Sequence, residues 1–152
     1  MNFKSFFFSV LLLGATFTTF SQSIAFNTDD TKIALDGYSP VSYIDLNLAQ
    51  RGSKEFKSTY DGIHYYFTSA EQKAVFDAKP AKYIPQYGGY CATGIAVAGK
   101  FRTDPNKYLV RDGKLYMFLY NVEVDALQLW LDDEKGMSEK AEANWKKMKY
   151  VK

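Results

Sequence analysis

The sequence predicts an α+β domain in which two β-hairpins form a small antiparallel sheet that packs against three or so helices. Two Asp-Gly pairs, at residues 61–62 and 112–113, each separate two short runs rich in aromatic and aliphatic residues. Asp-Gly readily adopts the positive φ angles of a tight turn, so each pair predicts a hairpin. A segment with helical spacing of its apolar residues follows each hairpin. The result resembles a duplicated β-β-α unit, in which the Asp-Gly turns are the only repeat visible at the level of residues.

The composition fits one domain preceded by a processing segment. The chain has 152 residues, including 12 Tyr and 12 Phe, and can therefore build its core from aromatic rings. Its formal net charge of +2 gives no strong field to recruit nucleic acid or anionic lipid. We therefore expect no nucleic-acid partner.

Residues 1–21 have the features of a signal peptide. Lys4 precedes the apolar run FFFSVLLL at residues 6–13, which is shorter than the ~20 residues that span a bilayer. Thr19 and Ser21 fit the small-residue sites ahead of a cleavage point after Ser21. We expect an exported protein, periplasmic or extracellular, that is not integral to the membrane; an uncleaved anchor is the alternative.

After cleavage, residues 22–35 are expected to form a loose leader, and residues 36–150 the folded domain. Gly37 and Pro40 mark a turn, and the apolar residues of the segment 41–46 indicate a short strand. Past the first hairpin (residues 56–67), the pair Ser69 and Gln72 has the spacing of a helical capping box, and Pro80 ends that helix.

The second half of the domain begins with small apolar residues that predict a tightly packed helix or turn after Gly88 and Gly89. The second hairpin covers residues 108–120. Asn121 is expected to cap the next helix, which ends before Gly136. Ser138 is expected to begin a last helix, through Met148.

Cys91 is the main candidate for chemistry. It is the only cysteine, so the chain can form no intramolecular disulfide. Gly88 and Gly89 precede it, and backbone N–H groups there are able to stabilise a thiolate. Tyr38, Tyr87 and Tyr90 could line a pocket beside it. The alternative is that Cys91 is a small buried residue and the tyrosines are core. His64, the only histidine, is expected to face solvent.

Several segments in order resemble the YHS domain family, in its exported, single-domain form. They span most of residues 36–145: GYSPVSY at 37–43, FKSTYDGIHYYF at 56–67, the SAE…F…P.KY pattern at 69–83, YGGYCA at 87–92 and AEANW at 141–145. Shorter relatives on copper-transporting and heavy-metal ATPases carry two cysteines where this chain has Thr68 and Gln72. The resemblance therefore implies that a soft or borderline metal ion, Cu or Zn, would have to use Cys91.

Three functions follow. The first is a binding module for a metal ion or small ligand, centred on Cys91 with Tyr38, Tyr87, Gly88, Gly89 and Tyr90. The second is a structural or interaction domain of the cell envelope. The third is a thiol enzyme with Cys91 as nucleophile, for which the sequence offers no evident base, so we expect no catalytic residue. A thiol that opens into a polar pocket would favour the first and third; a thiol sealed among apolar side chains would favour the second.

Overall fold

The computed structural model describes residues 23–119 and 123–150, and it has the α+β fold that the sequence predicts. The predicted signal peptide, including Thr19 and Ser21, and the expected cap Asn121 lie outside these residues. Within them, no helix is both long and apolar enough to cross a membrane. The strands and α-helices are, in chain order, β1 (Ser53–Tyr60), β2 (Ile63–Phe67), α1 (Ala70–Ala78), α2 (Pro80–Tyr83), α3 (Ala92–Ala96), β3 (Asp104–Arg111), β4 (Lys114–Phe118), α4 (Ala126–Asp132) and α5 (Glu134–Met148).

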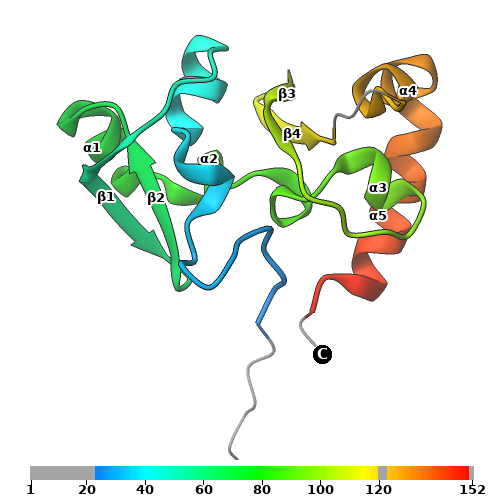
Figure 1. Cartoon of the computed structure of the whole chain (residues 1–152), viewed down its shortest axis with the longest axis horizontal. Coiled ribbons are helices and arrows are strands. Elements are labelled where there is room, and N and C mark those ends of the chain that lie inside the picture. The colour runs from blue at the N-terminus through cyan, green and yellow to red at the C-terminus, as the bar shows by residue number, and fades with distance from the viewer. Residues whose placement is uncertain (1–22, 120–122, 151–152) are drawn as a thin grey trace, which may run out of the picture.

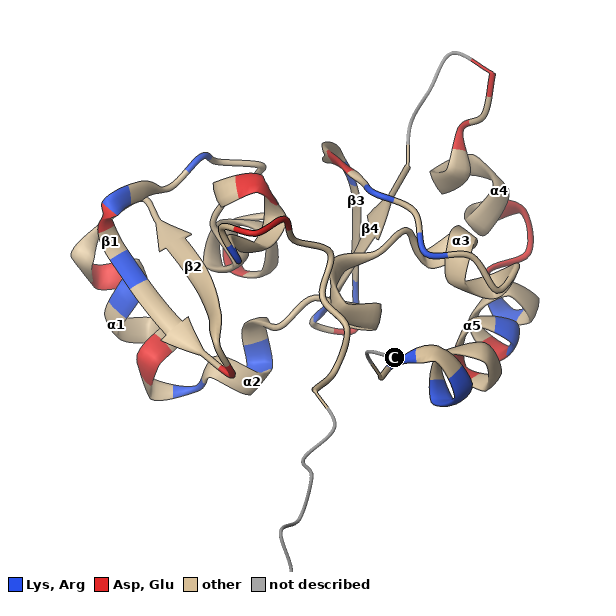
Figure 2. Cartoon of the chain, turned by 60° about the horizontal axis from the view of Figure 1, so that its bottom comes forward, with Lys and Arg blue, Asp and Glu red and all other residues tan. Residues whose placement is uncertain are grey.

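The two hairpins form separate two-stranded sheets and do not join into one. Both turn where predicted, with positive φ at Asp61 and Gly62 and again at Asp112 and Gly113. Figure 1 shows β1, β2 and α1 in one lobe, α3, α4 and α5 in the other, and β3 and β4 between them. Figure 2 shows acidic and basic residues interspersed over both lobes.

The two lobes are built from structurally equivalent halves, residues 33–83 and 85–148. Each half begins with a tight turn, η1 (Ala34–Gly37) or η3 (Gln86–Gly89), in which two successive residues adopt left-handed angles before a glycine that also has positive φ. These residues are Leu35 (φ 54°, ψ 31°) and Asp36 (50°, 28°) in the first half, and Tyr87 (53°, 35°) and Gly88 (61°, 23°) in the second.

The equivalence continues along both halves. The residues that follow the turns correspond at an offset of 52, so that Ser39 matches Cys91. The Ser39 side chain accepts a hydrogen bond from the backbone N–H of Ser42 at 3.3 Å, and the Cys91 sulfur accepts one from that of Gly94 at 3.4 Å. The sequence predicted a duplicated β-β-α unit, but the match of individual residues beyond the Asp-Gly turns was not visible, because most matched positions carry different residues.

The hairpins and the helices of the two halves also match. The register is the same at an offset of 51 residues, with an irregularity between Ser53 and Lys57 and another between Asp104 and Tyr108. In each half a single residue of similar backbone angles separates two helices: Lys79 (φ −148°, ψ 64°) lies between α1 and α2, and Asp133 (−146°, 59°) between α4 and α5. The repeat therefore extends from the first turn into the last helix.

The hairpin β3–β4 separates two hydrophobic cores. Alternate residues of a strand point to opposite faces of the sheet. Leu115 and Met117 accordingly pack into the first core, and Phe118 packs into the second. The largest fully buried residues of the first core are Tyr43, Tyr65, Phe67 and Phe76, and those of the second include Trp130, Ile95 and Phe118.

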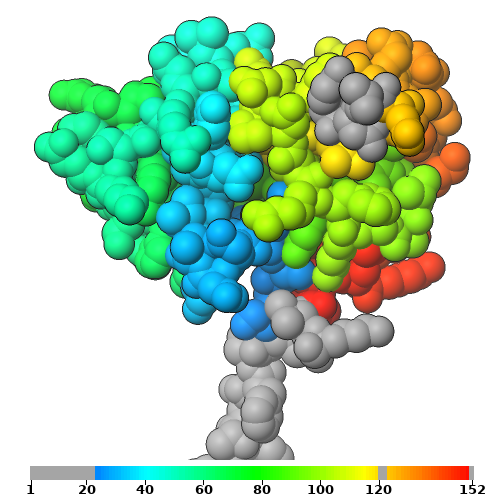
Figure 3. Space-filling model, viewed as in Figure 1, coloured from blue at the N-terminus to red at the C-terminus, as the bar shows by residue number. Residues whose placement is uncertain are grey.

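The segment expected to be a loose leader is packed at residues 25–28 and 33–35, whereas residues 29–32 are exposed. The Ala25 N–H donates to the Lys149 carbonyl at 2.6 Å, and the Asn27 N–H donates to the Gly88 carbonyl at 2.8 Å. Ala34 and Leu35, expected to belong to the same leader, are buried in the first core. Figure 3 shows these N-terminal residues, in blue, between the lower ends of the two lobes.

Two predicted elements differ from the structure, and one local prediction is confirmed. Residues expected to form a strand at 41–46 instead form a wide helical turn, η2 (Ser42–Leu46), which buries Ser42 and Tyr43. The last helix begins at Glu134 and runs through Gly136, because the Asp133 carboxylate accepts from the Gly136 N–H at 3.0 Å and caps the helix there. Ser69 caps α1 as predicted, accepting from the Gln72 N–H at 3.3 Å.

Candidate functional site

Cys91 lies in the second core and caps α3. It is 1% exposed, and its sulfur accepts the Gly94 N–H as the first residue before the helix. Burial raises the pKa of the Cys91 thiol, and the backbone N–H groups that contact the sulfur only partly oppose this effect. The structure thus agrees with the alternative given for Cys91, a small buried residue, and it also has the backbone N–H groups expected beside the sulfur. The thiol is therefore neutral at physiological pH, which makes it a poor nucleophile and a poor metal ligand.

Within the described residues, the predicted tyrosines form no pocket that opens onto Cys91, which is absent from the lining of both cavities found there. Tyr38 belongs to the first half, where it pairs with Arg51 and its ring stacks on Tyr43 with 6.4 Å between centroids. Tyr90 donates from its hydroxyl to the Phe26 carbonyl at 2.9 Å. Tyr87 is 4% exposed, and its hydroxyl donates to Glu142 at 3.2 Å. Tyr87 and Tyr90 thus pack with Cys91 in the second core and both contact Trp145, whereas Tyr38 packs against the first core.

Gly88 and Gly89 hold the chain's own N-terminal segment. A Cβ atom at Gly88 would lie 2.2 Å from the Ala25 carbonyl oxygen, so only glycine lets the segment cross at this distance. The Asn27 side chain donates to the Gly89 carbonyl at 3.0 Å. The close backbone approach predicted from these glycines does occur, and the group that approaches is residues 25–27.

A cavity of about 300 Å³ lies beside this crossing, and Tyr87 and Gly88 are part of its wall. Trp145 of α5 stands against Tyr87, with 6.0 Å between ring centroids and an interplanar angle of 73°. The tip of the first hairpin contributes Tyr60 and Asp61. The remaining lining residues are Ile24, Phe26, Ala81, Ile84, Pro85 and Gln86.

This cavity draws on four segments that are far apart in the sequence, so the sequence analysis found only two of its residues. Trp145 stands in the AEANW segment of the predicted last helix, and its aromatic side chain is the one signal that could have indicated a binding role. Asp61 was taken only as a turn residue. Among the described residues that line the cavity, Asp61 is the only one with an acidic or basic side chain, and it is exposed.

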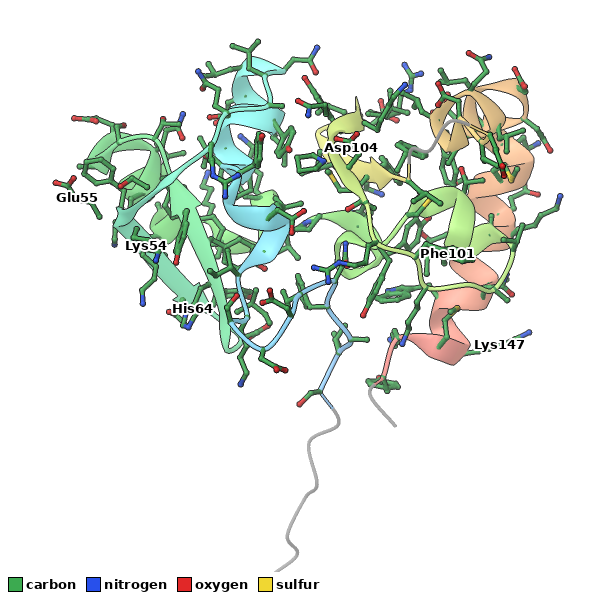
Figure 4. All side chains as sticks on the ribbon, in the orientation of Figure 1. Lys54, Glu55, His64, Phe101, Asp104 and Lys147 are labelled. Atoms are coloured by element: carbon green, nitrogen blue, oxygen red, sulfur yellow. The ribbon has the colours of Figure 1, made fainter. Side chains whose placement is uncertain are left out.

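His64 is far from Cys91 and cannot serve it as a base. Its Nδ1 atom is 2.8 Å from the Thr59 hydroxyl across the first hairpin. Cys91 lies beside Phe101, because its N–H donates to the Phe101 carbonyl at 3.1 Å. Figure 4 shows His64 and Phe101 on opposite lobes.

Thr68 and Gln72, which the family resemblance matched to the cysteines of metal-binding proteins, have a structural role here. Gln72 accepts, through its side-chain oxygen, from the Ser39 hydroxyl at 2.7 Å and the Thr68 N–H at 3.3 Å. The bond to Ser39 ties the start of α1 to the segment that follows the η1 turn. Among residues 23–119 and 123–150, no group of three or more His, Cys, Asp or Glu residues could hold a metal ion.

Comparisons with protein-family models, with curated proteins and with solved structures find no match to this chain. The case for a function therefore depends on the geometry of the molecule.

Proposed function

We propose that the protein is an exported binding module of the YHS type that takes a small aromatic ligand in the cavity between its two halves. The observation that carries the proposal is the wall of this cavity of about 300 Å³, to which Phe26, Tyr60, Tyr87 and Trp145 contribute. Small-molecule sites have this character: they are largely apolar and contain few polar groups. Export is inferred from the signal peptide expected at residues 1–21.

The charge of the cavity favours a ligand with a positively charged group. Asp61 supplies a carboxylate at the rim, and aromatic faces attract cations through their quadrupole. Burial raises the pKa of Tyr87, so its hydroxyl stays protonated and donates to Glu142. The proposed ligand is therefore an aromatic amine of the size of phenethylamine.

Phenethylamine and 3-phenylpropionate, which differ in the sign of their charge, provide the test. We expect phenethylamine to shift the NMR signals of the Gly88 amide and the Trp145 indole N–H in a saturable way, and 3-phenylpropionate to bind more weakly. Asp61→Asn should lower the affinity for phenethylamine about threefold, which is the size of effect expected for an exposed ion pair. Asn retains the turn, because it also tolerates positive φ.

Asp112→Asn, the equivalent change in the second hairpin, is the matched control and should leave binding unchanged. Equal affinity for the two ligands, or equal effects of the two substitutions, would rule out Asp61 as the selecting group. If neither ligand shifts the signals of the cavity, the proposed function fails.

The second candidate is a structural or interaction domain of the cell envelope. The burial of Cys91, at 1% exposure in an apolar core, favours it because the thiol then acts as a packing residue. Under this alternative the native thiol reacts with a small disulfide reagent only at the rate of unfolding, and the cavity binds neither test ligand. A fast reaction in the folded state would exclude it.

A further inference from the structure

The comparison of the two halves points to a second candidate site, because the second half binds the chain's own N-terminal segment at its η3 turn. In the second half, residues 25–27 cover the η3 turn. The Asn27 N–H donates to the Gly88 carbonyl at 2.8 Å, and the Asn27 side chain donates to the Gly89 carbonyl at 3.0 Å and the Thr103 hydroxyl at 3.1 Å. Gly88, Gly89 and Thr103 thus hold the chain's own N-terminal segment.

The equivalents of these three residues in the first half are Asp36, Gly37 and Gly52, and they line an open cavity of about 380 Å³. No segment of the described chain covers the η1 turn as residues 25–27 cover η3. The same face of the repeat is therefore filled in one half and open in the other.

The difference between Gly88 and Asp36 decides what the open cavity can hold. A side chain at residue 88 would collide with the crossing segment, since its Cβ would lie 2.2 Å from the Ala25 oxygen. Asp36 has such a side chain, so an occupant cannot follow the same close path and instead meets a carboxylate. A molecule smaller than a polypeptide strand fits this change.

Four charged side chains line the cavity: Asp29, Asp36, Arg51 and Lys54. Asp29 is fixed, because its carboxylate accepts the Thr31 N–H at 2.9 Å, and its hydrogen bonds with Thr31 lower its pKa. Within residues 23–119 and 123–150, neither Arg51 nor Lys54 forms an ion pair.

Asp36 is also available to a ligand. Its only ion-pair partner in the described chain is Arg102, at 3.9 Å, and the two side chains are 54% and 67% exposed. A pair this long and this exposed contributes little. The cavity thus presents two carboxylates and two cations, with apolar surface from Ile33 and Tyr66.

We propose that this cavity is a binding site for a small zwitterionic peptide, of the size of a dipeptide. The ammonium group of the ligand faces Asp29 and Asp36, and its carboxylate faces Arg51 and Lys54. An apolar side chain of the ligand lies against Ile33 and Tyr66. The volume of about 380 Å³ is in the range of sites for small ligands. This site is separate from the aromatic cavity between the halves.

The dipeptide leucyl-glycine tests the proposal by NMR titration of the whole mature protein. We expect saturable shifts of the Gly37 and Gly52 amide signals. N-acetyl-leucyl-glycine lacks the cation and leucyl-glycine amide lacks the carboxylate, so each should bind about three- to fivefold more weakly. Asp36→Asn should lower the affinity for leucyl-glycine by a similar factor and leave the affinity for the acetylated peptide unchanged.

Asp36→Asn is expected to fold, because Asn readily adopts the positive φ that Asp36 has. Asp112→Asn is the matched control and should bind all three peptides as the wild type does. Three outcomes overturn the proposal: no shift at Gly37 and Gly52, equal affinity for the three peptides, or shifts confined to the η3 turn.

Discussion

The two halves of the molecule share one backbone plan and differ in what covers the outer face of their hairpins. In the second half this face carries Leu115 and Met117, which are 0% and 1% exposed because they pack into the first core. The equivalent residues of the first half, His64 and Tyr66, are only partly buried and carry polar atoms. The first hairpin therefore behaves as the terminal unit of a repeat, which needs a polar outer face.

The comparison also explains why the two halves carry different chemistry. The second half uses its η3 turn to hold residues 25–27, and glycine at residue 88 permits this. The first half has Asp36 at the same place and leaves its η1 turn open. One scaffold thus provides a structural contact in one half and a candidate site in the other.

The largest expected effect is a difference in stability loss between equivalent substitutions on the outer faces of the two hairpins. Leu115→Ala removes a fully buried side chain between β4 and the first core and should lower the free energy of unfolding by about 3 kcal/mol. His64→Ala changes the equivalent position and should alter it by no more than about 0.5 kcal/mol. Urea unfolding at equilibrium measures both. Similar losses for the two variants would show that the first hairpin is not a terminal face.

The second prediction concerns the crossing of the N-terminal segment over η3. Gly88→Ala adds a Cβ where the Ala25 oxygen lies and also places alanine at φ +61°, so we expect a loss of about 2–3 kcal/mol. Gly113→Ala places alanine at φ +71° in open space and should cost only about 1 kcal/mol.

Cleavage by chymotrypsin after Phe26 provides an independent measurement for the same two variants, Gly88→Ala and Gly113→Ala. Gly88→Ala should displace residues 25–27 and accelerate this cleavage, whereas Gly113→Ala should not. If both variants lose the same stability and are cleaved at the wild-type rate, the segment does not depend on Gly88.

Those features that depend on a few neighbouring residues were predictable from the sequence. The Asp-Gly turns and the Ser69 cap are set by local backbone preferences, and both lie where they were expected. The wide turn at 42–46 was predicted as a strand, because its burial of Tyr43 comes from contacts with distant residues such as Tyr108. The burial of Cys91 depends on tertiary packing in the same way.

The duplicated β-β-α unit was predicted, but its residue-by-residue correspondence was hidden for a different reason. The offset between equivalent residues is 52 at Tyr38 and Tyr90, 51 in the hairpins and 54 at Lys79 and Asp133, so no single shift aligns the halves. The aromatic cavity was also beyond sequence reasoning, because its wall joins segments of both halves. Tyr87 and Gly88 were found only because they lie next to Cys91.

The smallest expected effect distinguishes Cys91 from its equivalent, Ser39. Ser39 is 0% exposed and donates its hydroxyl proton to Gln72 at 2.7 Å. In the second half, Ala126 occupies the matching position of α4 and has no side-chain acceptor. Cys91→Ser would therefore bury a hydroxyl without this partner and should lower the free energy of unfolding by about 1–2 kcal/mol at pH 7.

The difference in the free energy of unfolding between the wild type and Cys91→Ser should shrink in alkaline solution. Burial raises the pKa of Cys91 above its ordinary value of 9.0, so the folded state holds the thiol proton where the unfolded state has lost it. A raised pKa contributes stability that is fully present below pH 9 and is lost as the pH rises, by up to about 1.4 kcal/mol per pH unit. Serine does not titrate there, so the wild type should lose more stability than Cys91→Ser between pH 9 and 10. Urea unfolding at pH 7, 9 and 10 measures this loss, and parallel curves for the two proteins would mean that the Cys91 pKa is not raised by folding.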